Sequence, residues 1–591
     1  MIHQFNGFGN LVRGEIIECE ADQVLISDRA VRLHDGVDTV APIGIRQADD
    51  HGVDHLGVLF EHHLDLGGKD IFSAGDDHVA AAVGKVQVAF RVHIAHVADA
   101  AEALAVRRQR RDVLIYHARA VVAPGHEDLA DLAGGQFVAV LIADGHPGFG
   151  ITAYNLVADV MGEDCIMNGQ GSGWFWYDCV YNVKSRYTST GWRSYDMWNG
   201  YYTWISNVNY ILAEEETMSG SETEKNYVLG QAYAVRAYSY FMLAQMFSRT
   251  YKGHESEPCV PLYTEPTDIA TEGKGRATVE EVYQQITSDL DKAITMLGNS
   301  GKRKHISHIN EAVASGIKAR VALVMEDWQT ALDAANAAIS KSGCSIGTGT
   351  AVTGGMNDAT ANNVMWAAEI IADQSGMYAG FFTHMDADQG KYGASARKQI
   401  NKLLYAKLGT NDVRKKWWNP QDENNEKNGY QQEKFKFKDY AKWTGDYIFM
   451  RIEEMFLTAA EASCRLNDDK GARLMLNSLM QKRDEDYTCK KTGTALGKLT
   501  SDETGSLLEE IIIQRRIELW GEFGRIYDIR RLKQGFRRTA DMGWPSSALI
   551  AGTDTEDPES YAWVLTIPQT EFDGNPNMDP SKDQNPIGDH K

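Results

Sequence analysis

The chain has 591 residues, with 60 lysine and arginine residues against 82 aspartate and glutamate residues, giving a formal net charge of −22. This acidic balance argues against nucleic acids and anionic membrane surfaces as partners, because both repel negative charge. No run of about eighteen apolar residues is present, so the sequence predicts no membrane-spanning helix. The length admits either several domains or one large domain with an extension.

The composition changes abruptly near residue 150. Twelve of the 17 histidines precede that point, whereas none of the 13 tryptophans occurs before Trp174, and lysine is represented there only by Lys69 and Lys85. We therefore predict two parts, residues 1–150 and residues 151–591. Apolar periodicity in the first part is short and broken, which indicates a segment of unknown fold or of no stable fold.

Three hypotheses remain open for residues 1–150. The first is an accessory domain that binds a metal, based on the histidine pairs His51 and His55, His62 and His63, and His93 and His96. The second is an ordinary fused domain of short strands. The third is a sequence never selected to fold, arising from a misplaced start or a joined reading frame, and the broken periodicity favours this third hypothesis.

Aromatic residues gather in two polar segments farther along the chain. The first lies between residues 159 and 198, where glycine and serine around Trp174 indicate a loop, and the second spans residues 363–442. Exposed aromatic side chains forgo about 1.5–3 kcal/mol of burial each, so a ligand is expected to cover them. Sugar rings suit such surfaces because their apolar C–H faces stack on aromatic planes.

We predict that the two insertions form one exposed ligand platform from Trp174, Trp176, Tyr378, Phe381 and Phe382. Trp174 and Trp176 are two residues apart, so both project to the same side of an extended segment. Asn168 and Arg186 are the candidates for hydrogen bonds to ligand hydroxyl groups. In the alternative interpretation, the aromatic side chains pin the loops onto the body of the protein.

Apolar residues elsewhere recur with the period of an α-helix, as in residues 198–212 and 227–247. Residues 310–340 and 452–480 each contain two such patterns with alanines facing larger side chains. Pairs of about 34 residues with this pattern are typical of tetratricopeptide repeats, although a generic helical core explains the alanines equally well. We therefore predict a mainly α fold with degenerate helix pairs and long loop insertions.

The segment from Glu509 to Leu532 reads EEIIIQRRIELWGEFGRIYDIRRL and threads five acidic residues and five arginines through apolar ones. Because guanidinium groups bind carboxylates in pairs, this density predicts a structural ion network rather than a catalytic site. Arg515 and Glu518 are three residues apart and are expected to pair on the helix surface. In general, we expect the acidic side chains of Glu518, Glu522 and Asp528 to be partners of Arg515, Arg525 and Arg530.

The sequence contains no glycine-rich phosphate loop, no HExxH and no GxSxG, so it predicts no catalytic residue, metal or cofactor. The seven cysteines show no CxxC spacing; Cys165 and Cys179 could bridge a loop, but free thiols are expected. A glycoside hydrolase would need two carboxylates about 5 to 9.5 Å apart across a sugar-binding cleft. Several acidic residues lie near aromatic ones, but nothing singles out a pair among Asp178, Asp196, Asp386 and Asp388.

Several segments of the chain resemble the SusD/RagB family. Residues 509–532 resemble its signature near the C-terminus, which contains Arg-Glu-Leu, Gly-Arg and Asp-Leu-Arg-Arg. The predicted helix FMRIEEMFLTAAEA, which includes Glu461, resembles the family's Leu-Arg-x-x-Glu helix that ends in Ala-Glu-Ala. Further similar segments follow in the family's order: residues 231–243, 260–262 and 276–297, and the tail of residues 567–586. The resemblance covers about residues 151–591.

The resemblance implies a SusD-like helical domain that binds oligosaccharides at the outer-membrane cell surface without catalysis. It also implies delivery of the ligand to a SusC-like TonB-dependent transporter, glycan contacts in the insertions, and a structural role for the signature residues Arg515, Glu518, Glu522, Arg525, Asp528, Arg530 and Glu461. The alternatives are binding of peptides or other nutrients in the same system and a tetratricopeptide adaptor for proteins. A helical glycoside hydrolase is less favoured.

Members of this family carry a secretory signal that ends in a lipid-modified cysteine. Met1–Asn10 has no positive n-region and no apolar h-region. Cys19 follows Ile-Ile-Glu and lacks the small residue that lipoprotein processing requires before the cysteine. We therefore expect membrane association through an N-terminal lipid anchor to be a family property that this sequence lacks.

Overall fold

The computed structural model describes residues 16–18, 24–26, 150–182, 191–375, 380–389, 391–419, 429–550 and 554–587. The chain divides into two compact units, Met1–Gly125 and His126–Lys591. In the first unit, strands β1 (Ile16–Glu18) and β2 (Val24–Ile26) pair antiparallel. The histidine pairs considered as metal ligands, Met1–Asn10 and Cys19 lie outside the described residues.

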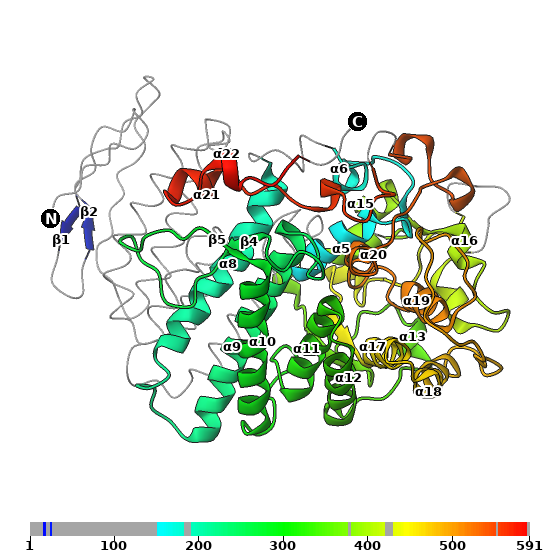
Figure 1. Cartoon of the computed structure of the whole chain (residues 1–591), viewed down its shortest axis with the longest axis horizontal. Coiled ribbons are helices and arrows are strands. Elements are labelled where there is room, and N and C mark those ends of the chain that lie inside the picture. The colour runs from blue at the N-terminus through cyan, green and yellow to red at the C-terminus, as the bar shows by residue number, and fades with distance from the viewer. Residues whose placement is uncertain are drawn as a thin grey trace. The chain divides into compact units, whose positions relative to one another are not determined.

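The second unit is mainly helical, which confirms the predicted fold class. Consecutive helices pack against one another from α8 to α12, and the row that they form is visible in Figure 1. Helix α17 extends this packing through contacts with α12, α18 and α19. The longer helices are α5 (Ile151–Met161), α8 (Trp192–Ala213), α9 (Glu222–Phe247), α10 (Val279–Gly298), α11 (Glu311–Met325), α12 (Trp328–Ser342), α17 (Ile452–Arg465), α18 (Asp469–Met480), α19 (Leu507–Glu518) and α20 (Arg525–Arg531).

Short helical turns occupy the long connections between these helices. Four-to-six-residue helices and single 3₁₀ turns alternate with irregular chain, as expected of insertions rich in glycine and polar residues. They are α6 (Trp176–Cys179), α13 (Thr350–Thr353), η3 (Ala372–Gln374), α14 (Phe381–Met385), α15 (Lys391–Ser395), α16 (Lys402–Tyr405), η4 (Val413–Trp417), η5 (Tyr440–Lys442), η6 (Ala540–Met542), η7 (Ser546–Ala548), η8 (Tyr561–Trp563), α21 (Gln569–Gly574) and α22 (Pro580–Asp583).

Local sequence explains where the helices begin and how closely they pack. Ser221 with Glu224 caps the start of α9, and Thr278 with Glu281 caps α10, each as a complete capping box. Gly316 in α11 permits a close approach, because a Cβ atom there would lie 2.5 Å from the sulfur of Met450. The same holds between helices: a Cβ atom on Gly230 of α9 would lie 2.7 Å from Leu297 of α10, so a small residue facing a large one lets this pair pack closely.

Three short antiparallel strand pairs attach the insertions to the helices. Strand β3 (Cys165–Met167) pairs with β7 (Lys398–Ile400), and β6 (Val364–Ala368) pairs with β8 (Tyr447–Arg451). Strand β4 (Pro258–Pro261) pairs with β5 (Arg276–Thr278). The β3–β7 pair joins the two aromatic insertions directly, although about 230 residues separate them along the chain.

An apolar core fills the space between α17, α18 and α19, where Leu457, Leu476 and Ile511 are fully buried. Burial of each such side chain stabilises the fold by about 1.5–3 kcal/mol relative to exposure. Of the helices in the described part of the chain, none is long and apolar enough to cross a membrane.

Candidate ligand-binding site

The two insertions that the sequence singles out lie side by side. Besides the β3–β7 pair, the ring of Phe175 meets the ring of His384 edge-on, with their centroids 5.0 Å apart. His384 in turn stacks on Tyr392 at 5.0 Å, with an angle of 12° between the ring planes. Segment 381–395, which carries α14 and α15, is therefore where the second insertion contacts the first, through the rings of His384 and Phe175.

The first aromatic loop, which we define as residues 169–180, is not extended, and that expectation is wrong. Phe175 adopts a left-handed conformation with φ of 63°, and a short helix begins directly after it. As a result Trp176 is buried, whereas Trp174 is half-buried and Tyr177 is 40% exposed. The Tyr177 hydroxyl accepts a hydrogen bond of 3.2 Å from the side chain of Gln170. The exposed aromatic surface of this loop comes from Trp174 and Tyr177.

Phe381 and Phe382 belong to the interior instead of the surface. They are 6% and 2% exposed, and their rings pack against Tyr447 and, respectively, against Phe435 and Phe437. Both rings therefore hold α14, and with it the second insertion, against the body of the protein, as the alternative interpretation of the aromatic residues expects. The prediction that Phe381 and Phe382 form part of an exposed ligand platform is wrong.

Of the three remaining predicted ligand-contact residues, the structure describes only Asn168. Tyr378 and Arg186 are outside the described residues. Asn168 is half-buried at the end of β3, where its backbone N–H donates to the carbonyl of Arg397 at 3.2 Å. Of the predicted platform, Trp174 and Asn168 thus lie at least partly at the surface in the described part of the chain.

A second aromatic loop, which we define as residues 436–444, adds an exposed cluster that sequence reasoning missed. The rings of Phe437, Tyr440 and Trp443 contact one another with centroids 4.9 to 5.8 Å apart. Tyr440 is 42% exposed, while Phe437 and Trp443 are half-buried. The alternation of aromatic residues and lysines in KFKDYAKW, just before Gly445, is the signal that could have identified this loop.

The conformation of the second aromatic loop is fixed by its own backbone. Asp439 and Thr444 exchange backbone hydrogen bonds of 3.1 Å, and the Asp439 carboxylate accepts from the N–H of Ala441 at 3.0 Å. Trp443 adopts φ of 56°, a left-handed conformation that a bulky residue rarely takes. The Tyr440 hydroxyl donates to the carbonyl of Gln389 at 3.3 Å, which ties the loop to segment 381–395.

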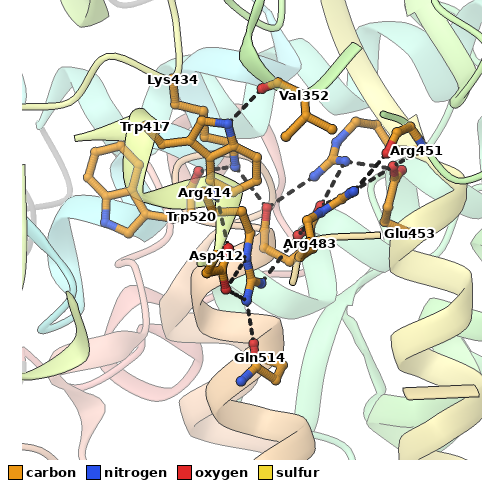
Figure 2. Close-up of polar contacts among 12 residues, drawn as sticks. Val352, Asp412, Arg414, Trp417, Lys434, Arg451, Glu453, Arg483, Gln514 and Trp520 are labelled. Atoms are coloured by element: carbon orange, nitrogen blue, oxygen red, sulfur yellow. Dashed lines mark hydrogen bonds and ion pairs between the residues drawn. The ribbon is translucent and has the colours of Figure 1, made fainter. Parts of the chain in front are cut away.

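A buried ionic network holds the chain on both sides of this loop (Figure 2). Before the loop, the Lys434 ammonium donates to the carbonyls of Glu518 and Trp520 at 2.8 and 2.9 Å. After the loop, Arg451 at the end of β8 pairs with Glu518 at 3.1 Å and with Glu522 at 2.7 Å. Burial lowers the pKa of Lys434 to about 8, although the neighbouring Glu522 opposes that shift.

Glu518 lies at the centre of the network and is fully buried. Arg451, Arg483 and Arg414 converge on its carboxylate, with N–O distances of 3.1, 2.8 and 3.3 Å. Burial alone would raise the pKa of Glu518, but the three guanidinium groups hold it well below its ordinary value. Figure 2 shows that Arg414 also bonds Asp412 and Gln514.

The predicted ion network exists, but most of its predicted pairings are wrong. Arg515 pairs with Asp528 at 2.7 Å, which is one of the expected pairings, and not with Glu518 three residues away. Arg525 pairs with Glu163 and Asp164, at 3.0 and 3.2 Å.

The two remaining signature residues, Arg530 and Glu461, are also buried, and their partners lie far from them in the sequence. The guanidinium of Arg530 donates to the carbonyls of Gln245 and Ser248. Glu461 forms a two-point pair with Arg531, at 2.6 and 2.8 Å. Long-range packing therefore outcompetes the i, i+3 spacing on which the sequence prediction relied.

Asp159 is a buried acid with one unsatisfied oxygen. Its Oδ1 accepts from the backbone N–H of Arg525 at 3.0 Å, whereas Oδ2 has no hydrogen-bond partner. Asp159 lines a cavity of about 20 Å³ beside Trp520, which is enough for one water molecule and too small for a sugar ring. Burial raises the pKa of Asp159 to about 8, so its carboxyl group is mostly neutral near pH 7.

The four acids weighed for hydrolysis are engaged in the structure. Asp178 pairs with Arg193 at 2.8 Å, and Asp196 accepts from the Tyr154 hydroxyl at 3.3 Å. Asp386 accepts from the backbone N–H of Phe437 at 3.1 Å, and Asp388 pairs with Lys436 at 3.3 Å.

Metal and thiol chemistry receive no support within the described part of the chain. There, no group of three histidine, cysteine, aspartate or glutamate residues is arranged to hold a metal ion. Cys165 and Cys179 are free and buried, and burial raises the pKa of both thiols, so both are in the neutral form.

Two family models match this chain. Residues 162–323 match the model described as "Starch-binding associating with outer membrane", and residues 385–587 match the model described as "SusD family". A comparison with curated proteins gives no match.

Solved structures share the fold. A SusD-like carbohydrate binding protein from Bacteroides vulgatus is 24% identical, with a TM-score of 0.63 over 76% of this chain and 96% of that one. A SusD superfamily protein from Bacteroides thetaiotaomicron is 23% identical, with a TM-score of 0.61 over 78% and 99%. The surface glycan-binding protein A from Bacteroides fluxus is 17% identical, with a TM-score of 0.57 over 78% and 100%.

The ionic network generates a stability prediction. Glu518→Gln should lower the free energy of unfolding by about 3–5 kcal/mol, because three buried guanidinium groups lose their shared counter-charge. Glu556→Gln is the matched control: it breaks the exposed pair of Glu556 with Arg537 and should cost at most about 1 kcal/mol. Denaturant unfolding measures both, and equal losses in the two variants would show that the network is not structural.

Asp159 generates a pH prediction. Its pKa is about 8 in the folded protein and about 3.9 when unfolded, so the folded state holds an extra proton between these values. The wild type should therefore lose stability relative to Asp159→Asn as the pH rises from about 4 to about 8, by at most about 1.4 kcal/mol per unit. Thermal unfolding across this range tests it, with Asp573→Asn on the exposed surface of α21 as the control. Parallel pH profiles for wild type and Asp159→Asn would contradict it.

Proposed function

This chain belongs to the SusD family, and from that premise we propose that it binds oligosaccharides without cleaving them. We define the aromatic face as the exposed or half-buried rings of the two aromatic loops, Trp174, Tyr177, Tyr440 and Trp443; each loop contacts segment 381–395. The observation that carries the proposal is the pair Tyr440 and Trp443, because the loop fixes these partly exposed rings before any ligand arrives. Preorganisation reduces the entropy cost of binding.

The chemistry of the aromatic face suits sugars. The rings of Tyr440 and Trp443 lie 4.9 Å apart at an angle of 58°, so they offer two differently oriented apolar planes. Asp439 and Lys442 flank these rings, are exposed, and pair with each other at 3.2 Å. Apolar planes stack on the C–H faces of sugar rings, and the flanking polar groups can hydrogen-bond sugar hydroxyls.

A binding role fits the acids near the aromatic loops better than hydrolysis does. Hydrolysis of a glycosidic bond needs one carboxyl group to donate a proton and a second to act as base or nucleophile. Asp178 and Asp388 are each paired with a cation, and Asp386 is held by backbone N–H groups. These acids therefore serve the architecture of the loops.

We further propose that the bound oligosaccharide is delivered to a SusC-like TonB-dependent transporter at the outer membrane. The match of residues 162–323 to a family described as associating with the outer membrane supports this part of the proposal. Co-purification of this protein with such a transporter from membranes tests it, and recovery of the protein without the transporter after mild detergent extraction would oppose it.

The ligand-binding proposal predicts the effect of removing single rings. Tyr440→Ala should weaken oligosaccharide binding at least about tenfold, equivalent to about 1.4 kcal/mol. Its effect on thermal stability should be smaller, because 42% of the side chain is exposed and the hydroxyl makes one bond, to the carbonyl of Gln389. Tyr177→Ala should act in the same direction from the first aromatic loop. Calorimetric titration with a panel of oligosaccharides and peptides measures both.

The matched control is Trp328→Ala, because Trp328 is a half-buried aromatic residue on α12, outside both loops. It should leave binding unchanged. Binding of peptides alone, or release of reducing ends from the oligosaccharides, would overturn the proposed function, and so would equal affinities of Tyr440→Ala and wild type.

A further inference from the structure

The second aromatic loop carries three exposed lysines among its rings. Lys436, Lys438 and Lys442 keep 42%, 44% and 65% of their side-chain surface exposed. In isolation, such a row of ammonium groups would favour anionic ligands, such as sugars that carry carboxylates or sulfates.

Each of these ammonium groups is already neutralised by a carboxylate. Lys442 pairs with Asp439 at 3.2 Å, while Lys436 and Lys438 each contact two acids. For Lys436 the partners are Asp388 at 3.3 Å and Glu433 at a shorter distance, and for Lys438 they are Asp358 at 3.2 Å and Asp446 at 2.9 Å. Three ammonium groups thus pair with five carboxylates within and beside the second aromatic loop.

We infer that the second aromatic loop selects neutral oligosaccharides and excludes carboxylated and sulfated ones, an inference that rests on the function proposed above. The ion pairs hold hydrogen-bond donors and acceptors in fixed positions, which sugar hydroxyl groups can use. An anionic substituent would instead meet the surplus of carboxylates, or would have to displace Asp388 or Asp439 from its lysine.

The surplus of carboxylates near the second aromatic loop should repel anionic ligands. Like charges brought together at an interface oppose binding and suppress the wrong partners. Two of the carboxylates, Asp388 and Asp439, remain 49% and 39% exposed at the side chain, so they face an arriving ligand directly. The chain's net charge of −22 acts in the same direction at longer range, where salt screens it over about 8–10 Å.

The experiment is calorimetric titration of the full chain with two panels of oligosaccharides of equal length, one neutral and one containing uronic acids. Neutral ligands should bind at least about tenfold more tightly than their acidic counterparts. Raising the salt concentration should strengthen the binding of the acidic ligands and leave that of the neutral ones unchanged, because salt screens repulsion.

The double variant Asp358→Asn/Asp388→Asn tests the surplus of carboxylates on which the inference rests; their side chains are 47% and 49% exposed, and neither is among the groups proposed to bind sugar hydroxyls. It should strengthen the binding of acidic ligands about fivefold or more and leave neutral ligands within about twofold, because it removes the repelling charges and retains the shape. Glu216→Gln/Glu222→Gln is the matched control with the same change in net charge; Glu216 lies in the turn after α8, and Glu222 is the first residue of α9. It should leave the discrimination unchanged.

The outcomes separate this inference from the proposed function. Acidic ligands that bind as tightly as neutral ones, or binding that weakens with added salt, would overturn the inference and leave oligosaccharide capture intact. A double variant that discriminates as the wild type does would overturn the role of these carboxylates. Failure of every carbohydrate to bind would overturn both proposals.

Discussion

The convergence of three arginines on one buried carboxylate is the constraint on which this structure depends. Glu518 sits at the end of α19, and its partners Arg414, Arg451 and Arg483 come from η4, β8 and the segment after α18. A charge in the protein interior is tolerated only when its partners are in place, since an unpaired one costs several kcal/mol. The four segments are therefore held in one mutual arrangement.

The buried network also fixes the position of the candidate ligand-binding site. Lys434 and Arg451 fix the chain just before and just after the second aromatic loop, and α14 is fixed by the rings of Phe381 and Phe382. The exposed rings are thus attached to rigid supports, and little freedom remains to be lost when a ligand binds. The buried rings position the exposed ones: Phe382 packs against Phe437, and Phe437 packs against Tyr440.

Sequence reasoning succeeds where the signal is local and fails where it is not. The period of apolar residues and the family resemblance identify the helices, and the density of arginine and carboxylate identifies the network. The partner of Arg525 is Glu163, which no local spacing reveals, because the contact spans most of the described chain. Composition likewise cannot distinguish Phe381, which is buried, from Tyr440, which is exposed; only the packing of α14 against β8 separates them.

The position of Lys434 and Arg451 outside the second aromatic loop has a consequence for how this protein can change. The buried ionic bonds of Lys434 and Arg451 lie outside residues 436–444, so this part of the folding energy does not depend on the exposed side chains of Tyr440 and Lys442. Substitutions at the exposed rings and their ion pairs can therefore accumulate without unfolding the domain. A surface loop can thus change its ligand contacts while the buried ion pairs that support it stay in place, at little cost in stability.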